Sequence, residues 1–309
     1  MENKPKYFYL AHGVMALEGL KGLIVRNYTP EFVIVHKDYD IQKMHESFYS
    51  PIEKLCSDYD IPLIKSEKLA GQKDNFRNFD FGISAGFMEI IGKDVFGIPK
   101  HGIINLHCGK LPFYRGRAPI SRTIMDGNKY LTISLHKIDE GVDSGDLLIE
   151  HNIEIGIDDD VNSLYKKCCE QAADMLIKGV EKLFSGEEDI FTAQDLSLKE
   201  KPNKKITDAE RRINWVKSVE AIHNLIRALT IPYPCAYSEY DSKKYNFIKS
   251  EIFDRDRCNA RQPGELYFAD DEYILINCVD GLIKITEIRD ENNQKINYEE
   301  IFKPRGIFR

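Results

Sequence analysis

The sequence predicts an α/β protein in which a mostly parallel sheet flanked by helices is followed by a smaller β-rich part. Apolar strand-like runs alternate with helical spacing in the first half of the chain, which is typical of βαβ units. A long amphipathic helix comes next, and after it the chain changes to short strands separated by turns. The 309 residues, 42% hydrophobic and 30% charged, suit one large domain or two modest ones.

Six apolar runs predict the strands of the first sheet, at residues 6–11, 32–36, 61–64, 79–86, 102–107 and 132–138. Between the first two runs, residues 13–27 have the apolar spacing of a helix, with Val14, Leu17 and Leu20 on one face. Residues 158–186 predict a longer helix, because acidic residues crowd its start and Gly186 follows its end. Such sheets bind ligands beyond the carboxyl ends of their strands.

A polar, charged stretch at residues 197–212 predicts a linker. Residues 213–229 then predict an amphipathic helix that stops at "TIPYP". The remainder predicts a small β domain that could close into a barrel, with strands at residues 236–240, 244–253, 264–269, 273–279 and 282–289. We therefore expect a catalytic domain at 1–203, and a linker helix with a C-terminal domain at 204–309.

Composition narrows the class of protein. The net charge of −7 argues mildly against a large nucleic-acid surface, which is usually basic. No apolar run approaches a membrane span, and the first residues lack the features of a signal peptide. Seven irregularly spaced cysteines without a C-x-x-C pair predict reduced thiols in the cytoplasm, with neither zinc nor disulfides. The glycine fingerprints of dinucleotide and Walker A sites are absent.

Polar side chains end the fifth predicted strand, in the stretch "INLHCGKLPFYRGRAPI" at residues 104–120. Asn105 and His107 are two residues apart, so both point to the same face of the strand. An acidic loop at residues 139–148 follows the sixth strand and could bring Asp143 to His107. A carboxylate-oriented His is a good general base, and an Asn amide can stabilise an oxyanion. The trio suits acyl transfer to a substrate amine.

Structural roles are the alternative for each of these residues taken singly. A His at a strand end is often only a satisfied structural side chain, and an Asp before Ser-Gly is a common turn former. We interpret His136, inside the sixth strand, and His223, in the later helix, as structural. The order of the three polar residues, with a Gly-Pro-Arg loop between them, favours a site.

The stretch "NLHCGKLPFYRGRAPI", followed by "DEGVDSGDLL", resembles the catalytic signature of the 10-formyltetrahydrofolate-dependent formyltransferases. The family pattern is roughly N-x-H-x-S-L-L-P-x-Y-R-G-x-x-P followed by an Asp in a D-x-G loop, and the chain departs from it at "GKLP", residues 109–112. "INWVKSVEAIHNLIRALTIPYPCAY", "QPGELY" and "CVDGLIKITEI" are similar to later segments of the two-domain members. The resemblance implies a Rossmann-like N-terminal domain and an OB-like C-terminal barrel.

The resemblance also implies roles for individual residues. Asn105 would bind the formyl oxygen, His107 would take the proton of the attacking amine, and Asp143 would orient His107. The co-substrate 10-formyltetrahydrofolate would occupy a pocket whose residues include Glu89, Ile90, Ile91, Arg117, Asp139, Glu140 and Gly141. No metal is implied.

Two branches of the family differ in the amine that they formylate. The opening "YLAHGVMALEGLKGL" lacks the "GTPxFA" start of the methionyl-tRNA branch, and "PFYRGRAPI" is closer to "PKYRGRAPL" of an aminoarabinose enzyme than to "PRWRGAAPI". We therefore expect a sugar N-formyltransferase acting on a nucleotide-linked aminosugar, foremost a dTDP-linked 4-amino-4,6-dideoxysugar, in lipopolysaccharide O-antigen or surface glycan synthesis. Its candidate substrate-binding residues are His12, Gly13, Tyr114 and Arg115.

Other functions stay open from the sequence. The first alternative is a methionyl-tRNA formyltransferase. A formyltetrahydrofolate hydrolase or a binding module without turnover is less favoured. Sugar enzymes of the family are often dimers, so a homodimer is an open expectation, whereas neither a membrane nor a nucleic-acid partner is expected.

Overall fold

The computed structural model describes residues 5–36, 50–185, 187–255, 261–303 and 305–309. The chain divides into two compact units, which are described separately. The first contains residues 1–116, 131–153 and 165–203, and the second contains residues 117–130, 154–164 and 204–309. The units do not follow one cut in the sequence, because two short internal segments group with the C-terminal part. A single domain boundary after residue 203 stays a prediction.

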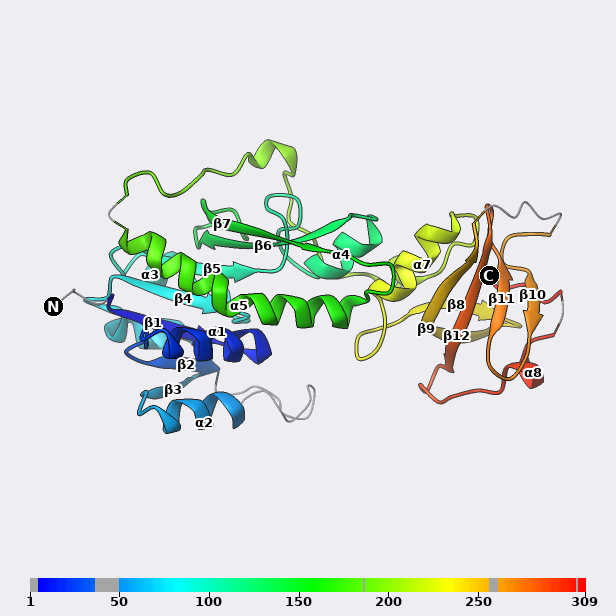
Figure 1. Ribbon diagram of the computed structural model, residues 1–309, viewed down its shortest axis with the longest axis horizontal. Helices are drawn as coiled ribbons and strands as arrows, with labels where there is room; N and C mark the ends of the chain where they lie inside the picture. Colours follow the sequence, from blue (N-terminus) through cyan, green and yellow to red (C-terminus); the bar gives the residue numbers. More distant parts are fainter. Residues whose placement is uncertain (1–4, 37–49, 186, 256–260, 304) are drawn as a thin grey trace. The chain divides into compact units, whose positions relative to one another are not determined.

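The first unit is built on a seven-stranded sheet in the order β3-β2-β1-β4-β5-β6-β7 (Figure 1). β1 pairs in parallel with β2 and β4, and β5 continues the parallel part beside β4. β6 runs antiparallel to β5, so the sheet is mixed rather than wholly parallel. The strands are β1 (Tyr7–Ala11), β2 (Val33–His36), β3 (Leu63–Ser66), β4 (Phe81–Ala85), β5 (Ile103–His107), β6 (Tyr130–Lys137) and β7 (Leu147–Glu154).

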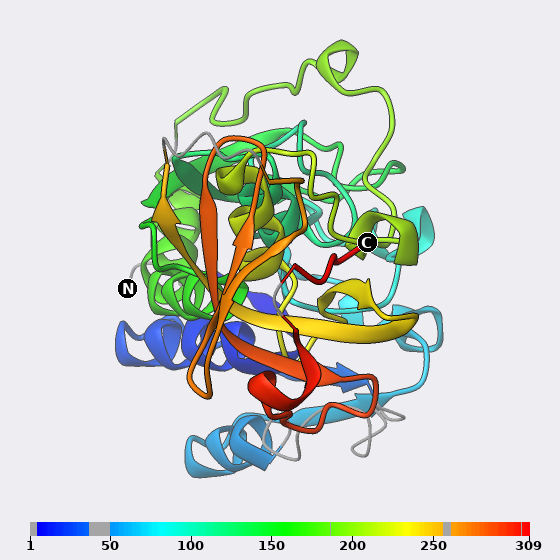
Figure 2. The same cartoon turned by 90° about the vertical axis from the view of Figure 1, so that its right-hand side faces the viewer.

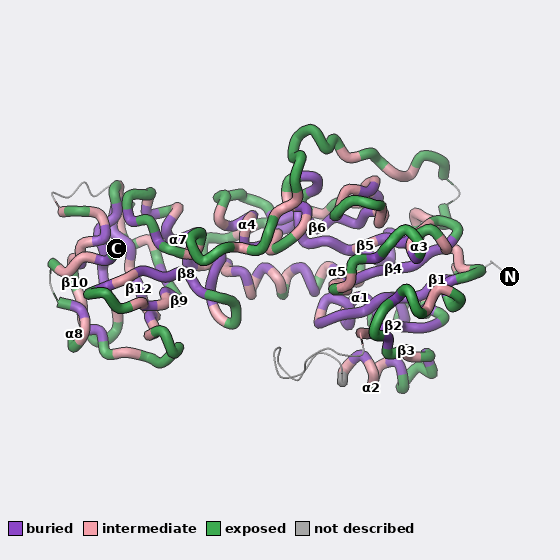
Figure 3. The backbone as a smooth tube through the Cα atoms, turned by 180° about the vertical axis from the view of Figure 1, so that it is seen from behind, coloured by how far each residue is buried: buried purple, intermediate pink, exposed green. Residues whose placement is uncertain are grey.

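Helices cover both faces of this sheet. On one face α1 (Gly13–Val25) packs closely on α5 (Val161–Phe184), since a Cβ added at Gly22 would lie 2.3 Å from the Cβ of Ala173. On the other face η1 (Leu69–Phe76) and α3 (Lys93–Phe96) join a buried cluster that includes Phe8 and Ile103. Figure 3 shows the buried course of β1, β4 and β5. α2 (Ser50–Asp58) and the short η2 (Leu196–Leu198) complete the unit.

The second unit contains an antiparallel five-stranded sheet in the order β10-β11-β12-β9-β8 (Figure 2). Its strands are β8 (Ala236–Tyr240), β9 (Lys243–Asp254), β10 (Leu266–Ala269), β11 (Ile274–Asn277) and β12 (Leu282–Asp290). The last residues connect its two edges, because Phe308 bridges to Tyr240 at the end of β8 and Ile307 bridges to Glu265 before β10. This closure fits the expected small barrel.

The helices in the described part of the second unit are α4 (Pro119–Met125), α6 (Asp208–Arg211), α7 (Val219–Ala228) and α8 (Tyr298–Ile301). α7 packs on α4 and on β9. It is shorter than the helix predicted at 213–229, because Ser218 caps it by accepting a hydrogen bond from the Ala221 N–H. Trp215, which precedes the cap, instead donates a hydrogen bond to Ser238 Oγ at 2.9 Å within the buried core.

Within the ranges that the structure describes, no helix combines the length and apolar character that a membrane crossing requires.

Candidate active site

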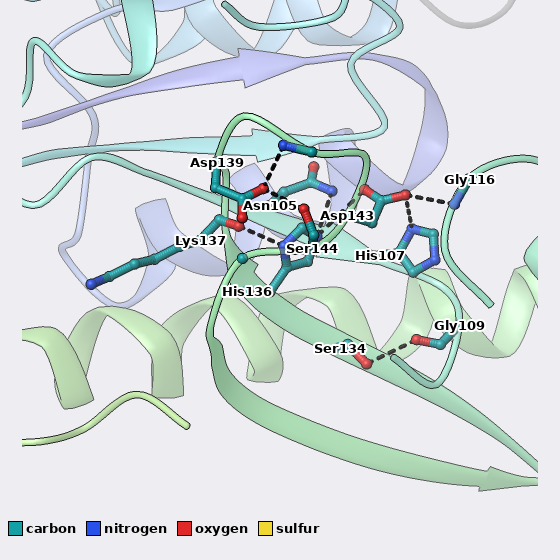
Figure 4. A network of polar contacts seen from close by, with 12 residues as sticks. Asn105, His107, Gly109, Gly116, Ser134, His136, Lys137, Asp139, Asp143 and Ser144 are labelled. Carbon is teal, nitrogen blue, oxygen red and sulfur yellow. Dashed lines mark hydrogen bonds and ion pairs between the residues drawn. The ribbon is translucent and has the colours of Figure 1, made fainter. Parts of the chain in front are cut away.

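The first unit places Asn105 and His107 at the carboxyl end of β5, on one face of the sheet (Figure 4). The antiparallel neighbour β6 sets His136 opposite Asn105 and Ser134 opposite His107. Because directly opposed residues share a face, all four side chains face the same side. His107 is buried, whereas Asn105 is half-buried. The strand end therefore presents a base and an amide from a rigid element.

Asp143 reaches the same place from the loop between β6 and β7. Its backbone is left-handed, with φ of 48°, a conformation that Asp tolerates better than most residues. Its Oδ2 atom accepts a hydrogen bond from the Gly116 N–H at 2.8 Å and lies 3.7 Å from His107 Nδ1. Figure 4 shows the carboxylate between His107 and the Gly116 backbone. The structure thus brings the three predicted catalytic residues together, while their roles stay predictions.

His136 also belongs to this cluster, which the sequence interpretation missed. Its Nε2 atom lies 3.3 Å from Asn105 Nδ2 and 3.6 Å from Asp143 Oδ1, and its Nδ1 atom lies 2.7 Å from the Lys137 carbonyl. The residue is only 1% exposed. The missing signal was strand direction, because only an antiparallel β5–β6 pair puts residue 136 opposite residue 105.

The electrostatics of the cluster favour a neutral His107 and an ionised Asp143. Burial lowers the pKa of His107, and the Asp143 charge opposes that effect only in part. Burial alone would raise the pKa of Asp143, but its contacts with His136 and His107 and the hydrogen bond from the Gly116 N–H lower it overall. A neutral imidazole beside a carboxylate can accept a proton near neutral pH.

Hydrogen-bond geometry indicates where that proton goes. The Tyr114 carbonyl lies 2.8 Å from His107 Nε2 and can only accept, so Nε2 carries a hydrogen. In the neutral ring the lone pair is then on Nδ1, which faces Asp143. Protonation at Nδ1 would convert this contact into an ion pair. The arrangement can therefore act as a general base that the carboxylate stabilises once it is charged.

Six of the seven predicted cofactor residues come from two segments that an ion pair joins. Lys93 Nζ lies 2.5 Å from Glu140 Oε1, which links the segment after β4 to the loop that carries Asp143. Glu89 accepts from the Leu69 N–H at 3.2 Å, Ile91 is buried, and Ile90 is 87% exposed. Within the loop, Asp139 Oδ1 accepts from the Gly141 N–H at 3.0 Å. Arg117 is exposed and belongs to the second unit.

The four predicted substrate-binding residues have different environments. His12 directly precedes α1, and burial together with the nearby His36 lowers its pKa to about 4. Gly13 begins the helix with φ of 75°. Tyr114 contributes its backbone carbonyl to His107. Arg115 is buried and donates to the carbonyls of Lys199 and Glu200, which explains an Arg at this position without a substrate.

Among the described residues, no group of three or more His, Cys, Asp and Glu side chains could hold a metal ion.

Comparison with known proteins identifies the family of both parts of the chain. A family model described as "Formyl transferase" matches residues 26–180, and one described as "Formyl transferase, C-terminal domain" matches residues 205–306. The methionyl-tRNA formyltransferase of Caldicellulosiruptor saccharolyticus is 30% identical over 86% of this chain and 86% of its own length. That of Thermodesulfovibrio yellowstonii is 30% identical over 94% of this chain and 93% of its own.

A solved structure shares the fold at lower identity. The N-formyltransferase of Helicobacter canadensis, in complex with folinic acid and dTDP-3-aminofucose, has a TM-score of 0.70 and is 18% identical. The match covers 91% of this chain and 98% of that one. At this identity the likeness concerns the fold alone.

The expectation of a sugar acceptor is wrong. The relatives that reach 30% identity over most of the chain are named for methionyl-tRNA, whereas the sugar enzyme resembles the chain only as a fold. The loop sequence that favoured the sugar branch lies where the Tyr114 carbonyl accepts from His107 and Arg115 donates to backbone carbonyls of the same unit. It therefore says little about the acceptor. Matched in both parts and similar to such relatives over most of its length, the chain belongs to the formyltransferase family.

Proposed function

We propose that this protein transfers the formyl group of 10-formyltetrahydrofolate to the α-amino group of methionyl-tRNA. The choice of acceptor rests on two methionyl-tRNA formyltransferases that are 30% identical to this chain, over 86% and 94% of its length. The cluster of Asn105, His107 and Asp143 supports the chemistry, because it supplies a neutral base, a carboxylate and an amide donor at one strand end.

The base in this mechanism is His107. The amine nitrogen attacks the formyl carbon and forms the new C–N bond while the carbonyl electrons move to oxygen. The attacking nitrogen loses a proton to His107 Nδ1, where Asp143 Oδ2 at 3.7 Å stabilises the resulting imidazolium. The proton then passes to N10 of the folate as the old C–N bond breaks. Tetrahydrofolate leaves, and the imidazole is neutral again.

Asn105 is the proposed donor to the oxyanion. One N–H of its amide faces His136 Nε2 at 3.3 Å, which fixes the orientation of the group. The His136 Nδ1 atom carries a hydrogen toward the Lys137 carbonyl, so in the neutral ring Nε2 accepts. The second amide N–H can then bond the formyl oxygen as charge develops on it. Loss of one such donor typically costs on the order of 100-fold in rate.

The folate would lie against the segments that the Lys93–Glu140 ion pair joins. Ile90, Met88 and Val142 are exposed apolar side chains on these two segments, and they offer contact surface for a flat ring. The backbone near Glu89 and Ile91 is held by the bond from Glu89 to the Leu69 N–H. In this proposal the donor needs no metal.

A formyl-transfer assay tests the proposal. The protein is offered 10-formyltetrahydrofolate with methionyl-tRNA, with uncharged tRNA, and with dTDP-linked 3-amino and 4-amino sugars. We expect formylmethionyl-tRNA alone to form. Turnover with an aminosugar and none with methionyl-tRNA would overturn the assignment of the acceptor.

A matched pair of His variants tests the mechanism. His107→Asn should lose about 100- to 10,000-fold in kcat, the usual contribution of a general base. His101→Asn, at an exposed position of the same unit, should retain the wild-type rate. Retention of activity in the His107 variant would remove that residue from the mechanism.

A further inference from the structure

A segment that follows α5 contacts both loops of the site. It comprises residues 191–203 and is called the strap here; Figure 1 draws it in light green. Near its start, Thr192 and Leu147 exchange two backbone hydrogen bonds of 2.8 Å, which tie the strap to the beginning of β7. At its end, Asn203 bridges to Gly116.

Gln194 binds the backbone of the catalytic loop. Its Nε2 atom donates to the Asp143 carbonyl at 3.0 Å and to the Gly145 carbonyl at 2.6 Å. Its Oε1 atom is buried and has no hydrogen-bond partner among the described residues, so the contacts that the amide makes come from its N–H groups. Gly145 lies close to the end of β6, since an added Cβ would lie 2.1 Å from the Lys137 carbonyl oxygen. Together these contacts hold the turn that carries Asp143.

The C-terminal end of the strap holds the segment that contains Gly116, whose N–H binds the Asp143 carboxylate. The Asn203 N–H donates to the Arg115 carbonyl at 2.8 Å, and the buried Arg115 guanidinium donates to the carbonyls of Lys199 and Glu200. Gly116 follows directly, and its N–H donates to Asp143 Oδ2 at 2.8 Å. One segment therefore restrains both the backbone and the carboxylate of Asp143.

We propose that Gln194 is a positioning residue for formyl transfer, which holds the Asp143 carboxylate at its working distance from His107. The inference rests on the proposed function for its kinetic readout. Asp143 sits at a positive φ on a loop, so the turn needs an external restraint to keep one conformation. Two hydrogen bonds from one side-chain amide to carbonyls on either side of Ser144 supply that restraint.

The titration of His107 reports on this positioning. Asp143 and His136 are the titratable groups that act on His107 among the described residues, and the Asp143 charge raises the His107 pKa. If the carboxylate moves away, the His107 pKa must fall. Loss of a contact that serves stability alone would leave this pKa unchanged.

The test uses Gln194→Met, which keeps the side-chain size but removes the donors, and Gln194→Glu, which sets a carboxylate against the two carbonyls. Ser197→Ala is the matched control, because Ser197 Oγ bonds only Asp195 within the strap at 2.6 Å. The imidazole signals of the full chain are titrated by NMR without substrate, with His107→Asn used for assignment. Formyl transfer is then measured as kcat and KM.

We expect Gln194→Met to lower the His107 pKa by about one unit and kcat by about tenfold, with KM for the folate unchanged. Gln194→Glu should lower kcat more than Gln194→Met does, and the Ser197 control should match the wild type. A wild-type His107 titration in the folded Gln194→Met variant, or an equal shift in the control, would overturn the proposal. Because the His107 titration needs no substrate, it tests the positioning role of Gln194 even if methionyl-tRNA is not the acceptor.

Discussion

Replacing Asp143 by Asn changes the charge beside His107 with little change of shape. The Asn oxygen can still accept from the Gly116 N–H, which Asp143 Oδ2 accepts at 2.8 Å. The Asn amide can face His136 Nε2, 3.6 Å from the present Oδ1. The lost quantity is the negative charge 3.7 Å from His107 Nδ1. The substitution therefore isolates electrostatic support of the base.

The size of the effect follows from that distance. An opposite charge within about 4 to 6 Å typically shifts a pKa by roughly one to three units. A middle value of about two units corresponds to about 2.7 kcal/mol, or about 100-fold in kcat. The direction of the pKa shift follows from the charge of Asp143. This carboxylate raises the His107 pKa against the effect of burial, so loss of the charge lowers that pKa further.

Two readouts check this prediction. Steady-state formyl transfer at saturating 10-formyltetrahydrofolate should show the fall in kcat, with a circular dichroism spectrum like that of the wild type. The acid limb of the kcat/KM profile should move to lower pH, because a more acidic imidazolium loses its proton at lower pH. A kcat within threefold of the wild type, with an unmoved acid limb, would refute electrostatic support by Asp143.

Three further substitutions have defined outcomes. His136→Phe should lower kcat about five- to tenfold, as expected for about 1 kcal/mol of lost hydrogen bonding to Asn105, and leave the folate KM unchanged. Gly116→Ala should lower the free energy of unfolding in urea by about 1 to 3 kcal/mol, since φ is 85° and an added Cβ would lie 2.5 Å from the Asn203 carbonyl. Wild-type stability should fall between about pH 6.5 and about pH 4, because the His12 pKa is lowered to about 4 in the folded state, and His12→Gln should lose less over that range.

The sequence predicted the site where local spacing decides the geometry. Asn105 and His107 share a face because they are two residues apart on a strand, and this needed no knowledge of the fold. The sequence interpretation left His136 out of the cluster because its position depends on a partner strand and on the direction of that strand. Gln194 lies 51 residues from Asp143 in the chain, and nothing in its neighbourhood marks it as part of the site.

Prediction of the strands was limited in the same way, because long-range contacts are not visible in local sequence patterns. The buried strands β1, β4 and β5 were predicted, because continuous apolar runs are typical of strands covered on both faces. β7 was missed, since only two of its eight residues are buried and half of its sequence "LLIEHNIE" is polar. Its hydrogen bonds to the strap, through Leu147 and Thr192, are long-range contacts that periodicity does not encode.

The wrong expectation about the acceptor rested in part on the net charge and on the loop sequence. Net charge was taken over the whole chain, yet residues 204–309 contain equal numbers of basic and acidic side chains, so the excess of acid arises entirely in residues 1–203. A polyanion responds to the local surface that it meets and not to the sum over a chain.

The loop comparison failed for a different reason. In "PFYRGRAPI", Tyr114 supplies a carbonyl to His107, Arg115 binds carbonyls of the strap, and Gly116 supplies an N–H to Asp143. In the proposed mechanism these contacts serve the formyl-transfer chemistry, which both branches of the family share. A motif under that constraint can agree between enzymes that formylate different amines, so the acceptor has to be sought outside it. The acceptor is therefore identified by the assay with methionyl-tRNA and aminosugars, and not by further comparison of this loop.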